Sequence, residues 1–208
     1  MIDTITMTTY GAIVLGFVFI PGPATLLTVT RAMSFGAKVG IATGTGIAAG
    51  DVVHTVMAIV GISAIIAASA TLFSIIKYIG AAYLVYLGIR AILERAPATF
   101  VARGAPISAG IAFRQAILAE VFNPKTALFF LAFLPQFVRA ENGSVAFQLA
   151  ILGLAFVLLG LVSTAVYAVS AGRLGDFLRR NPVVLKWQGK AVGAVYCALG
   201  VRLALERR

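Results

Sequence analysis

Long runs of apolar residues, separated by short polar connections, make up most of this chain. A hydrocarbon core of about 30 Å requires roughly 20 apolar residues per helical span, and six of the runs meet that length. They cover residues 5–30, 39–67, 72–93, 111–137, 145–171 and 184–205. The pattern therefore predicts an all-α membrane protein with about six transmembrane helices, in one domain over residues 1–208.

The sixth run is the weakest of the six, and a five-span arrangement is the alternative. Its uninterrupted apolar part extends only from Ala191 to Val201, so the flanking basic residues would have to snorkel to the interfaces. Basic residues gather in the connections on one side of the six-span arrangement, and the positive-inside rule makes that side cytoplasmic. Both termini then lie outside, whereas five spans would place the basic C-terminus inside.

Composition agrees with a membrane protein. The chain is 61% hydrophobic and 12% charged, with a mean hydropathy of +1.01, whereas soluble domains carry about 25% charged residues. The net charge of +10 comes mostly from the connections, so it does not predict a nucleic-acid partner. Cys197 is the single cysteine, which excludes an intramolecular disulfide. The N-terminal residues carry Asp3 and no basic region, so we expect the first span to be retained.

Two interruptions of the same kind, Pro21-Gly22-Pro23 and Asn123-Pro124-Lys125, lie within the first and fourth spans. In a bilayer every backbone polar group must be satisfied, so a broken helix persists only where protein or a watery cavity covers it. One proline would be interpreted as a simple kink. Paired breaks in two halves of a chain are instead typical of a transporter's binding site.

The breaks also suggest an internal repeat, with units at about residues 1–95 and 105–208. Each unit has three spans, and an odd number forces the second unit to be inverted relative to the first. Proline is favoured at the first position of a helix, so Pro23 and Pro124 should begin half-helices capped by Gly22 and Asn123. Helix N-termini attract anions, including carboxylates. We therefore predict a carboxylate site where the broken first helices of the two halves meet.

Two charged residues are expected deep in the membrane. Each would cost about 2.5–3.5 kcal/mol at the centre of a span, so such residues usually face a cavity or each other. Lys125 would bind a substrate carboxylate, and Asp51 the ammonium group or a coupling proton. The alternative is a structural salt bridge between the two halves. Glu120 shares a helix face with Asn123 and lies either in the cavity or in solvent at the cytoplasmic end.

Two further polar residues, His54 and Tyr83, each have two possible roles. His54 follows Asp51 by three positions on the same helix face, as a proton relay or as a polar packing residue. Since it is the only histidine, neither a metal site nor a metal cofactor is predicted. Tyr83 could hydrogen-bond a substrate or belong to the interfacial aromatic belt.

Glycines recur every four residues in the second span, at Gly36, Gly40 and Gly44 and again at Gly46 and Gly50. Small residues at this spacing allow helices to approach closely. We expect packing within the chain, with a homodimer face as the alternative.

Four stretches, in order along the chain, resemble the LysE/RhtB family of bacterial amino-acid exporters. They read P-G-P-A-T-L-L-T-V-T-R-A-M-S-F-G-A-K-V-G, G-I-A-A-G-D-V-V-H, Y-I-G-A-A-Y-L-V-Y-L-G-I-R and F-N-P-K-T-A-L-F-F-L-A-F-L-P-Q-F. The resemblance covers residues 10–140 closely and the remainder by pattern. It carries the family's motif positions to Pro21, Gly22, Pro23, Gly50, Asp51, Asn123, Pro124 and Lys125.

The resemblance implies export of amino acids or close analogues across the bacterial inner membrane, driven by protons through alternating access. It implies no enzyme and no cofactor. Ala24 stands where family members often carry Asn or Asp, and Glu120 stands where many carry Asn. These two differences leave open whether the substrate is a basic or a neutral amino acid. The rival functions are a membrane-embedded enzyme that uses Asp51 and His54, and a transporter of another small solute or ion.

Overall fold

The computed structural model describes residues 2–19, 22–68, 70–93, 106–180 and 182–205, and within these ranges the regular structure is helical. The predicted all-α class is therefore confirmed. The helices are α1 (Thr4–Phe19), α2 (Pro23–Phe35), α3 (Ala37–Ala68), α4 (Ala70–Leu93), α5 (Ala109–Val121), α6 (Pro124–Leu128), α7 (Val145–Arg180) and α8 (Pro182–Leu205). A π-helical turn (Phe129–Phe133) and two 3₁₀ turns (Leu134–Phe137 and Ala140–Asn142) connect α6 to α7.

Two to four of the predicted spans meet a length and hydropathy test among the described residues. Ala37–Gly61 of α3 and Val145–Ala171 of α7 pass alone, and the pairs α1–α2 and α5–α6 pass if each bent pair counts as one span. The helices α4 and α8 lie where the third and sixth spans were predicted, but in α8 only the stretch Tyr196–Leu205 counts as a short apolar helix. The number of spans beyond four thus stays a prediction.

Both predicted breaks are present. The axes of α1 and α2 differ by 49°, and the axis of α5 differs by 45° from that of the segment Pro124–Phe137. Gly22 and Asn123 occupy the N-cap positions, and the prolines that follow them begin α2 and α6. The Asn123 side chain accepts a hydrogen bond of 3.1 Å from the backbone amide of Lys125, as the sequence predicted for this cap.

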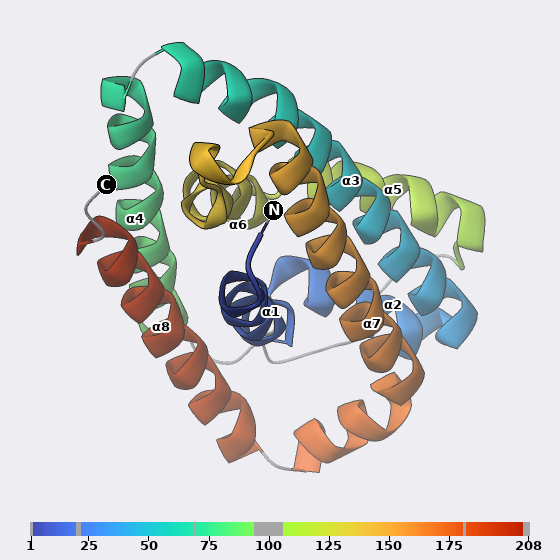
Figure 1. Cartoon of the computed structure of the whole chain (residues 1–208). Helices are drawn as coiled ribbons and strands as arrows, with labels where there is room; N and C mark the ends of the chain where they lie inside the picture. Colours follow the sequence, from blue (N-terminus) through green and yellow to red (C-terminus); the bar gives the residue numbers. More distant parts are fainter. Residues whose placement is uncertain (1, 20–21, 69, 94–105, 181, 206–208) are drawn as a thin grey trace.

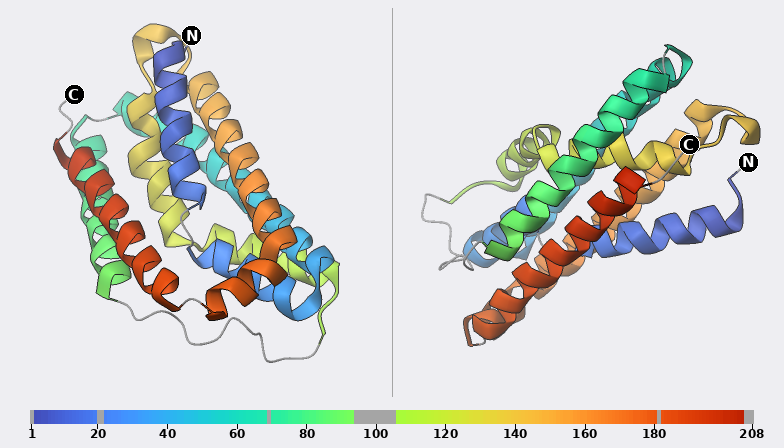
Figure 2. Two further views of the ribbon diagram at one scale, coloured as in Figure 1. Left: turned by 90° about the horizontal axis from the view of Figure 1, so that it is seen from below. Right: turned by 90° about the vertical axis from the view of Figure 1, so that its left-hand side faces the viewer.

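The helices form two groups, one on each side of α1 and α6 (Figure 1). Figure 1 shows α4 and α8 together on one side, α2, α3, α5 and α7 on the other, and α1 and α6 between them. In Figure 2 the first helix (blue) runs alongside the segment that continues α6 (yellow). Aromatic side chains fill the space between these central segments: the ring centroids of Phe17 and Phe129 are 4.4 Å apart, and those of Phe129 and Phe156 5.0 Å.

Glycines bring the backbones of neighbouring helices into contact, as their spacing predicted. A Cβ atom added to Gly40 would lie 2.5 Å from the Cβ of Ala32, and one added to Gly46 would lie 2.4 Å from the carbonyl oxygen of Phe113. Gly44 faces Thr164 of α7, and Gly50 faces Glu120 of α5, at similarly short distances. These four glycines pack against helices of the same chain, so they are not free to form a dimer face. For Gly36 the prediction was wrong: this residue ends α2 with a φ of 89°, and a Cβ atom there would have no neighbour within 4 Å.

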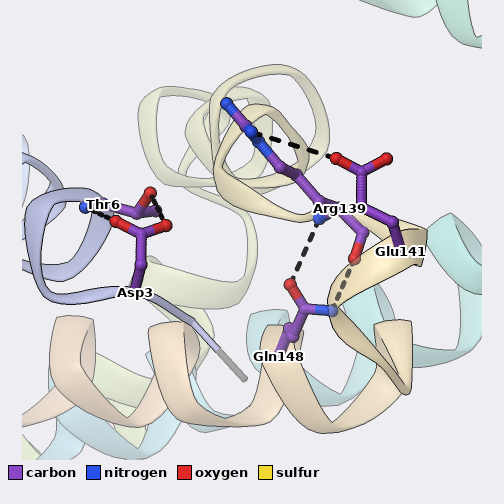
Figure 3. A network of polar contacts seen from close by, with 5 residues as sticks. All are labelled: Asp3, Thr6, Arg139, Glu141 and Gln148. Atoms are coloured by element: carbon purple, nitrogen blue, oxygen red, sulfur yellow. Dashed lines mark hydrogen bonds and ion pairs between the residues drawn. The ribbon is translucent and has the colours of Figure 1, made fainter.

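Hydrogen bonds stabilise the connection that precedes α7, residues 138–144, near the N-terminus of the chain (Figure 3). Buried Gln148 donates to the carbonyl oxygens of Arg139 (2.8 Å) and Gly143 (3.2 Å) and accepts from the amide of Arg139 (3.1 Å). Nearby, Asp3 caps α1 by accepting from the amide and hydroxyl of Thr6. These two hydrogen bonds lower the pKa of Asp3 below its usual value, and the bond from the Thr6 hydroxyl has the larger effect.

Replacement of Gln148 by leucine is expected to lower the free energy of unfolding by about 1–3 kcal/mol, because it removes three part-buried hydrogen bonds to the backbone of Arg139 and Gly143. Thermal unfolding of the detergent-solubilised protein would measure the loss. The control is Glu141→Gln, which removes the exposed 3.9 Å ion pair with Arg139 and should change stability by less than about 1 kcal/mol. Equal melting temperatures for Gln148→Leu and the unmodified protein would contradict the assignment.

Candidate functional site

A small cavity lies where the two helix breaks meet. The cavity has a volume of about 40 Å³, which is enough for a few water molecules but not for a larger solute. Its lining comes from both broken helices and from α3 and α7: Phe17, Val18, Gly22, Pro23, Ala24, Thr25, Ile47, Asp51, Glu120, Asn123, Lys125, Thr126, Phe156, Gly160 and Thr164. A solute of more than a few atoms requires these helices to move apart.

Three buried charged residues converge on this cavity from three helices. Asp51 of α3 and Glu120 of α5 are each 2% exposed, and Lys125 of α6 is 9% exposed. The sequence predicted Asp51 and Lys125 as deep charges and left the position of Glu120 open. The structure places Glu120 in the cavity and not in solvent.

The carboxylate of Glu120 is held in place by hydrogen bonds from residues that follow it in the chain. The Asn123 amide donates to both carboxylate oxygens at 3.2 Å, and the Thr126 hydroxyl donates to one of them. Nε2 of His54 lies 2.9 Å from the backbone carbonyl oxygen of Glu120, so this nitrogen carries the hydrogen in that contact. Glu120 therefore acts as a fixed acceptor at the end of α5.

Asp51 has spare hydrogen-bonding capacity. Its Oδ1 is buried and finds no hydrogen-bond partner among the described residues. Glu120 and Lys125 line the same cavity, so two buried carboxyl groups and one buried ammonium group share this small space. A small cavity lined by two buried carboxyl groups is suited to bind a cation.

Lys125 directs its ammonium group toward aromatic rings and a helix N-terminus. Nζ lies 4.2 Å from the ring centroid of Phe17 and 5.1 Å from that of Tyr196. A Cβ atom on Gly22, at the N-terminus of α2, would lie 2.9 Å from Nζ. Within the described ranges Lys125 forms no ion pair with Asp51 or Glu120 at salt-bridge distance. The alternative of a direct salt bridge between the halves is thus not what the structure has.

The remaining predicted residues divide between the cavity and its surroundings. Pro23 and Asn123 line the cavity, and Pro124 begins α6 beside it, whereas Pro21 lies outside the described residues. His54 is buried behind the cavity, with its ring stacked on Phe130 at 5.7 Å. Tyr83 does not line the cavity; it is half-buried on α4, with its ring 5.8 Å from that of Tyr86.

Sequence reasoning missed the contribution of α7 and the aromatic residues. Phe156, Gly160 and Thr164 recur every four residues along α7 and present one face to the cavity. The signal was available as a small and a polar residue at helical spacing within an apolar run. Among the described residues no three His, Cys, Asp or Glu side chains are grouped as metal ligands would be.

Broken helices that meet at a buried, charged cavity are the architecture of a membrane transporter. Comparison with known proteins agrees: the model of the LysE type translocator family matches residues 15–207, and this chain belongs to that family. It is therefore a multi-pass protein of the inner membrane and a member of a family that transports small molecules.

Several curated relatives align over most of their length. An uncharacterized membrane protein of Vibrio cholerae is 32% identical over 191 residues, which is 92% of each chain. The homoserine/homoserine lactone efflux protein of Salmonella typhimurium is 30% identical over 187 residues, 90% of each chain. The membrane protein YrhP of Bacillus subtilis is 36% identical over 154 residues, 70% of this chain and 73% of its own. No solved structure matches this chain significantly.

Proposed function

We propose that this protein exports amino acids or close analogues from the cytoplasm in exchange for protons, by alternating access. The observation that carries the proposal is the separation of charge within the cavity. A lysine and a helix N-terminus lie together, and a pair of carboxyl groups lies apart from them without a direct ion pair. An amino-acid zwitterion has the complementary charges.

The carboxylate of the substrate would bind between Lys125 and the start of α2. Gly22 has no side chain with which to cap this helix, so the first backbone amides of α2 have no side-chain acceptor there. The ammonium group of Lys125 lies next to the same helix end, and both features are positive. A carboxylate would satisfy the amides and the ammonium together.

The ammonium group of the substrate would bind at Asp51, whose Oδ1 is available, with the carboxyl group of Glu120 in the same cavity. The same carboxyl pair would hold a proton when no substrate is bound. A site that holds either an ammonium group or a proton, but not both, couples the export of one to the import of the other. This competition is our physical basis for antiport.

Alternating access would follow from two inverted units. Helix α3 of the first half packs on α7 of the second, and α4 packs on α8. Helix α5 packs on α3, and its equivalent in the first half, α1, contacts α7. These reciprocal contacts support the inverted repeat. The cavity is too small for an amino acid, so in this proposal the surrounding helices move apart when the substrate binds. A homodimer stays a prediction.

The named relative suggests the compounds to test first. Because the Salmonella typhimurium protein is a homoserine/homoserine lactone efflux protein, we propose small neutral amino acids such as homoserine and threonine as cargo. Proteoliposomes preloaded with labelled homoserine, threonine, leucine or lysine, with and without a pH gradient, would test this. Gradient-dependent loss of label supports the proposal, and release of none of the four would reject it.

Substitution of Lys125 by methionine is expected to separate two substrates that differ in the carboxylate. Homoserine has a free carboxylate and its lactone does not, so transport of homoserine should fall at least tenfold while transport of the lactone changes little. Initial export rates from proteoliposomes would measure both. Matched losses for the two compounds, at equal amounts of folded protein, would show that Lys125 does not recognise the carboxylate.

A further inference from the structure

The ammonium group of Lys125 lies against two aromatic rings from different helices. Phe17 comes from α1 and Tyr196 from α8, and their ring centroids are 6.0 Å apart with an interplanar angle of 50°. Nζ lies over both rings, at 4.2 Å from Phe17 and 5.1 Å from Tyr196. With no carboxylate at ion-pair distance, the faces of these two rings supply negative electrostatic potential to the ammonium group.

The ring of Tyr196 belongs to the aromatic core, but packing does not explain its hydroxyl. The residue is 4% exposed, and its hydroxyl is buried without a hydrogen-bond partner among the described residues. A leucine would fill an apolar position of this kind without an unsatisfied hydroxyl. The feature that links Tyr196 to the site is therefore its ring, which brings α8 into contact with the ammonium group of Lys125.

We propose that Tyr196 is a positioning residue for substrate recognition, which together with Phe17 seats the charged Lys125 side chain beside the N-terminus of α2. The two rings keep the ammonium group away from Asp51 and Glu120 when no substrate is bound. The ammonium group is then already positioned for an incoming carboxylate. A substrate carboxylate then binds an ammonium group that needs no reorientation. The inference rests on the proposed function, since it concerns binding of that carboxylate.

The test compares Tyr196→Leu, which removes the ring, with Tyr196→Phe, which keeps it. In proteoliposomes preloaded with homoserine, we expect Tyr196→Leu to raise the half-saturating concentration several-fold, the range expected from loss of one buried cation–π contact, and to change the maximal rate little. Tyr196→Phe should behave like the unmodified chain. Export of homoserine lactone, which has no free carboxylate, should be unaffected by either change. Tyr86→Leu, an exposed tyrosine of α4, is the matched control.

A double-mutant cycle separates positioning from a general packing role. In chains that already carry Lys125→Met, the further change Tyr196→Leu should leave the affinity for homoserine, measured by equilibrium binding to the purified protein, unchanged. Additive losses, or an equal loss for the lactone, would overturn the proposal in favour of packing. If the unmodified chain exports homoserine and Tyr196→Leu does so with the same half-saturating concentration, the inference fails while the proposed function stands. Absence of any export by the unmodified chain rejects both.

Discussion

Replacement of Asp51 by asparagine is expected to abolish amino-acid export driven by a pH gradient. The amide has nearly the same size, but it can neither pair with an ammonium group nor release a proton. Loss of one partner of a buried charge pair costs about 2–5 kcal/mol, which corresponds to a roughly 30-fold to several-thousand-fold weaker interaction. Initial rates in proteoliposomes with an imposed pH gradient would measure the effect.

Two comparisons make the result for Asp51 specific. Glu141→Gln removes an acid that is exposed in a connection, and it should export at the normal rate. The size-exclusion profile and melting temperature of Asp51→Asn should match those of the unmodified protein, because the substitution removes a buried charge and adds no volume. Normal gradient-driven export by a well-folded Asp51→Asn protein would remove this residue from the transport mechanism.

Replacement of Gly46 by valine is expected to prevent stable packing of α5 on α3. The added Cβ would meet the carbonyl oxygen of Phe113 at 2.4 Å and the Cβ of Ala116 at 2.8 Å. The first of these is a backbone atom and cannot rotate away, so the two helices have to separate. Overpacking of this kind costs about 3 kcal/mol or more, and the yield of monodisperse protein from membranes should fall sharply.

Gly11 provides the matched control, since a Cβ atom built there has no neighbour within 4 Å. Gly11→Ala lies within α1 and should leave stability unchanged or raise it by up to about 1 kcal/mol through helix propensity. Thermal melting in detergent compares the two variants directly. A Gly46→Val protein with an unaltered melting temperature would mean that α3 and α5 are packed less closely than described.

The helices and the breaks could be predicted because local rules govern them. Apolar runs of this length in a bilayer are helical, because a helix satisfies its own backbone groups. A proline that follows a capping residue favours the start of a helix, and on this basis Pro23 and Pro124 could be predicted to begin α2 and α6. The glycine spacing in α3 similarly predicted close helix contact without any knowledge of the partner helices. Each of these features depends on residues within one or two turns of one another.

The details of the site depend on contacts between distant parts of the chain, and here the sequence was less informative. Nothing local to Lys125 indicates that its ammonium group lies over rings from α1 and α8 instead of beside Asp51. The position of Glu120 was undecided because a residue at the end of a half-helix can face water or the cavity, and only the packing of α5 on α3 selects between them. Tyr83 was proposed for its hydroxyl, but α4 directs that side chain toward Tyr86.

Helix α3 has one face of glycines in contact with its neighbours and an opposite face of exposed apolar side chains, among them Val52, Val56 and Val60 at 46%, 54% and 68% exposure. The two faces differ in how much change their packing allows. On the exposed face one aliphatic residue can replace another with little effect, because lipid chains adapt to its shape. On the glycine face even one added methyl group meets a neighbouring helix. Divergence within this family should therefore accumulate along a single stripe of α3, while the stripe that carries Gly46 and Gly50 changes slowly.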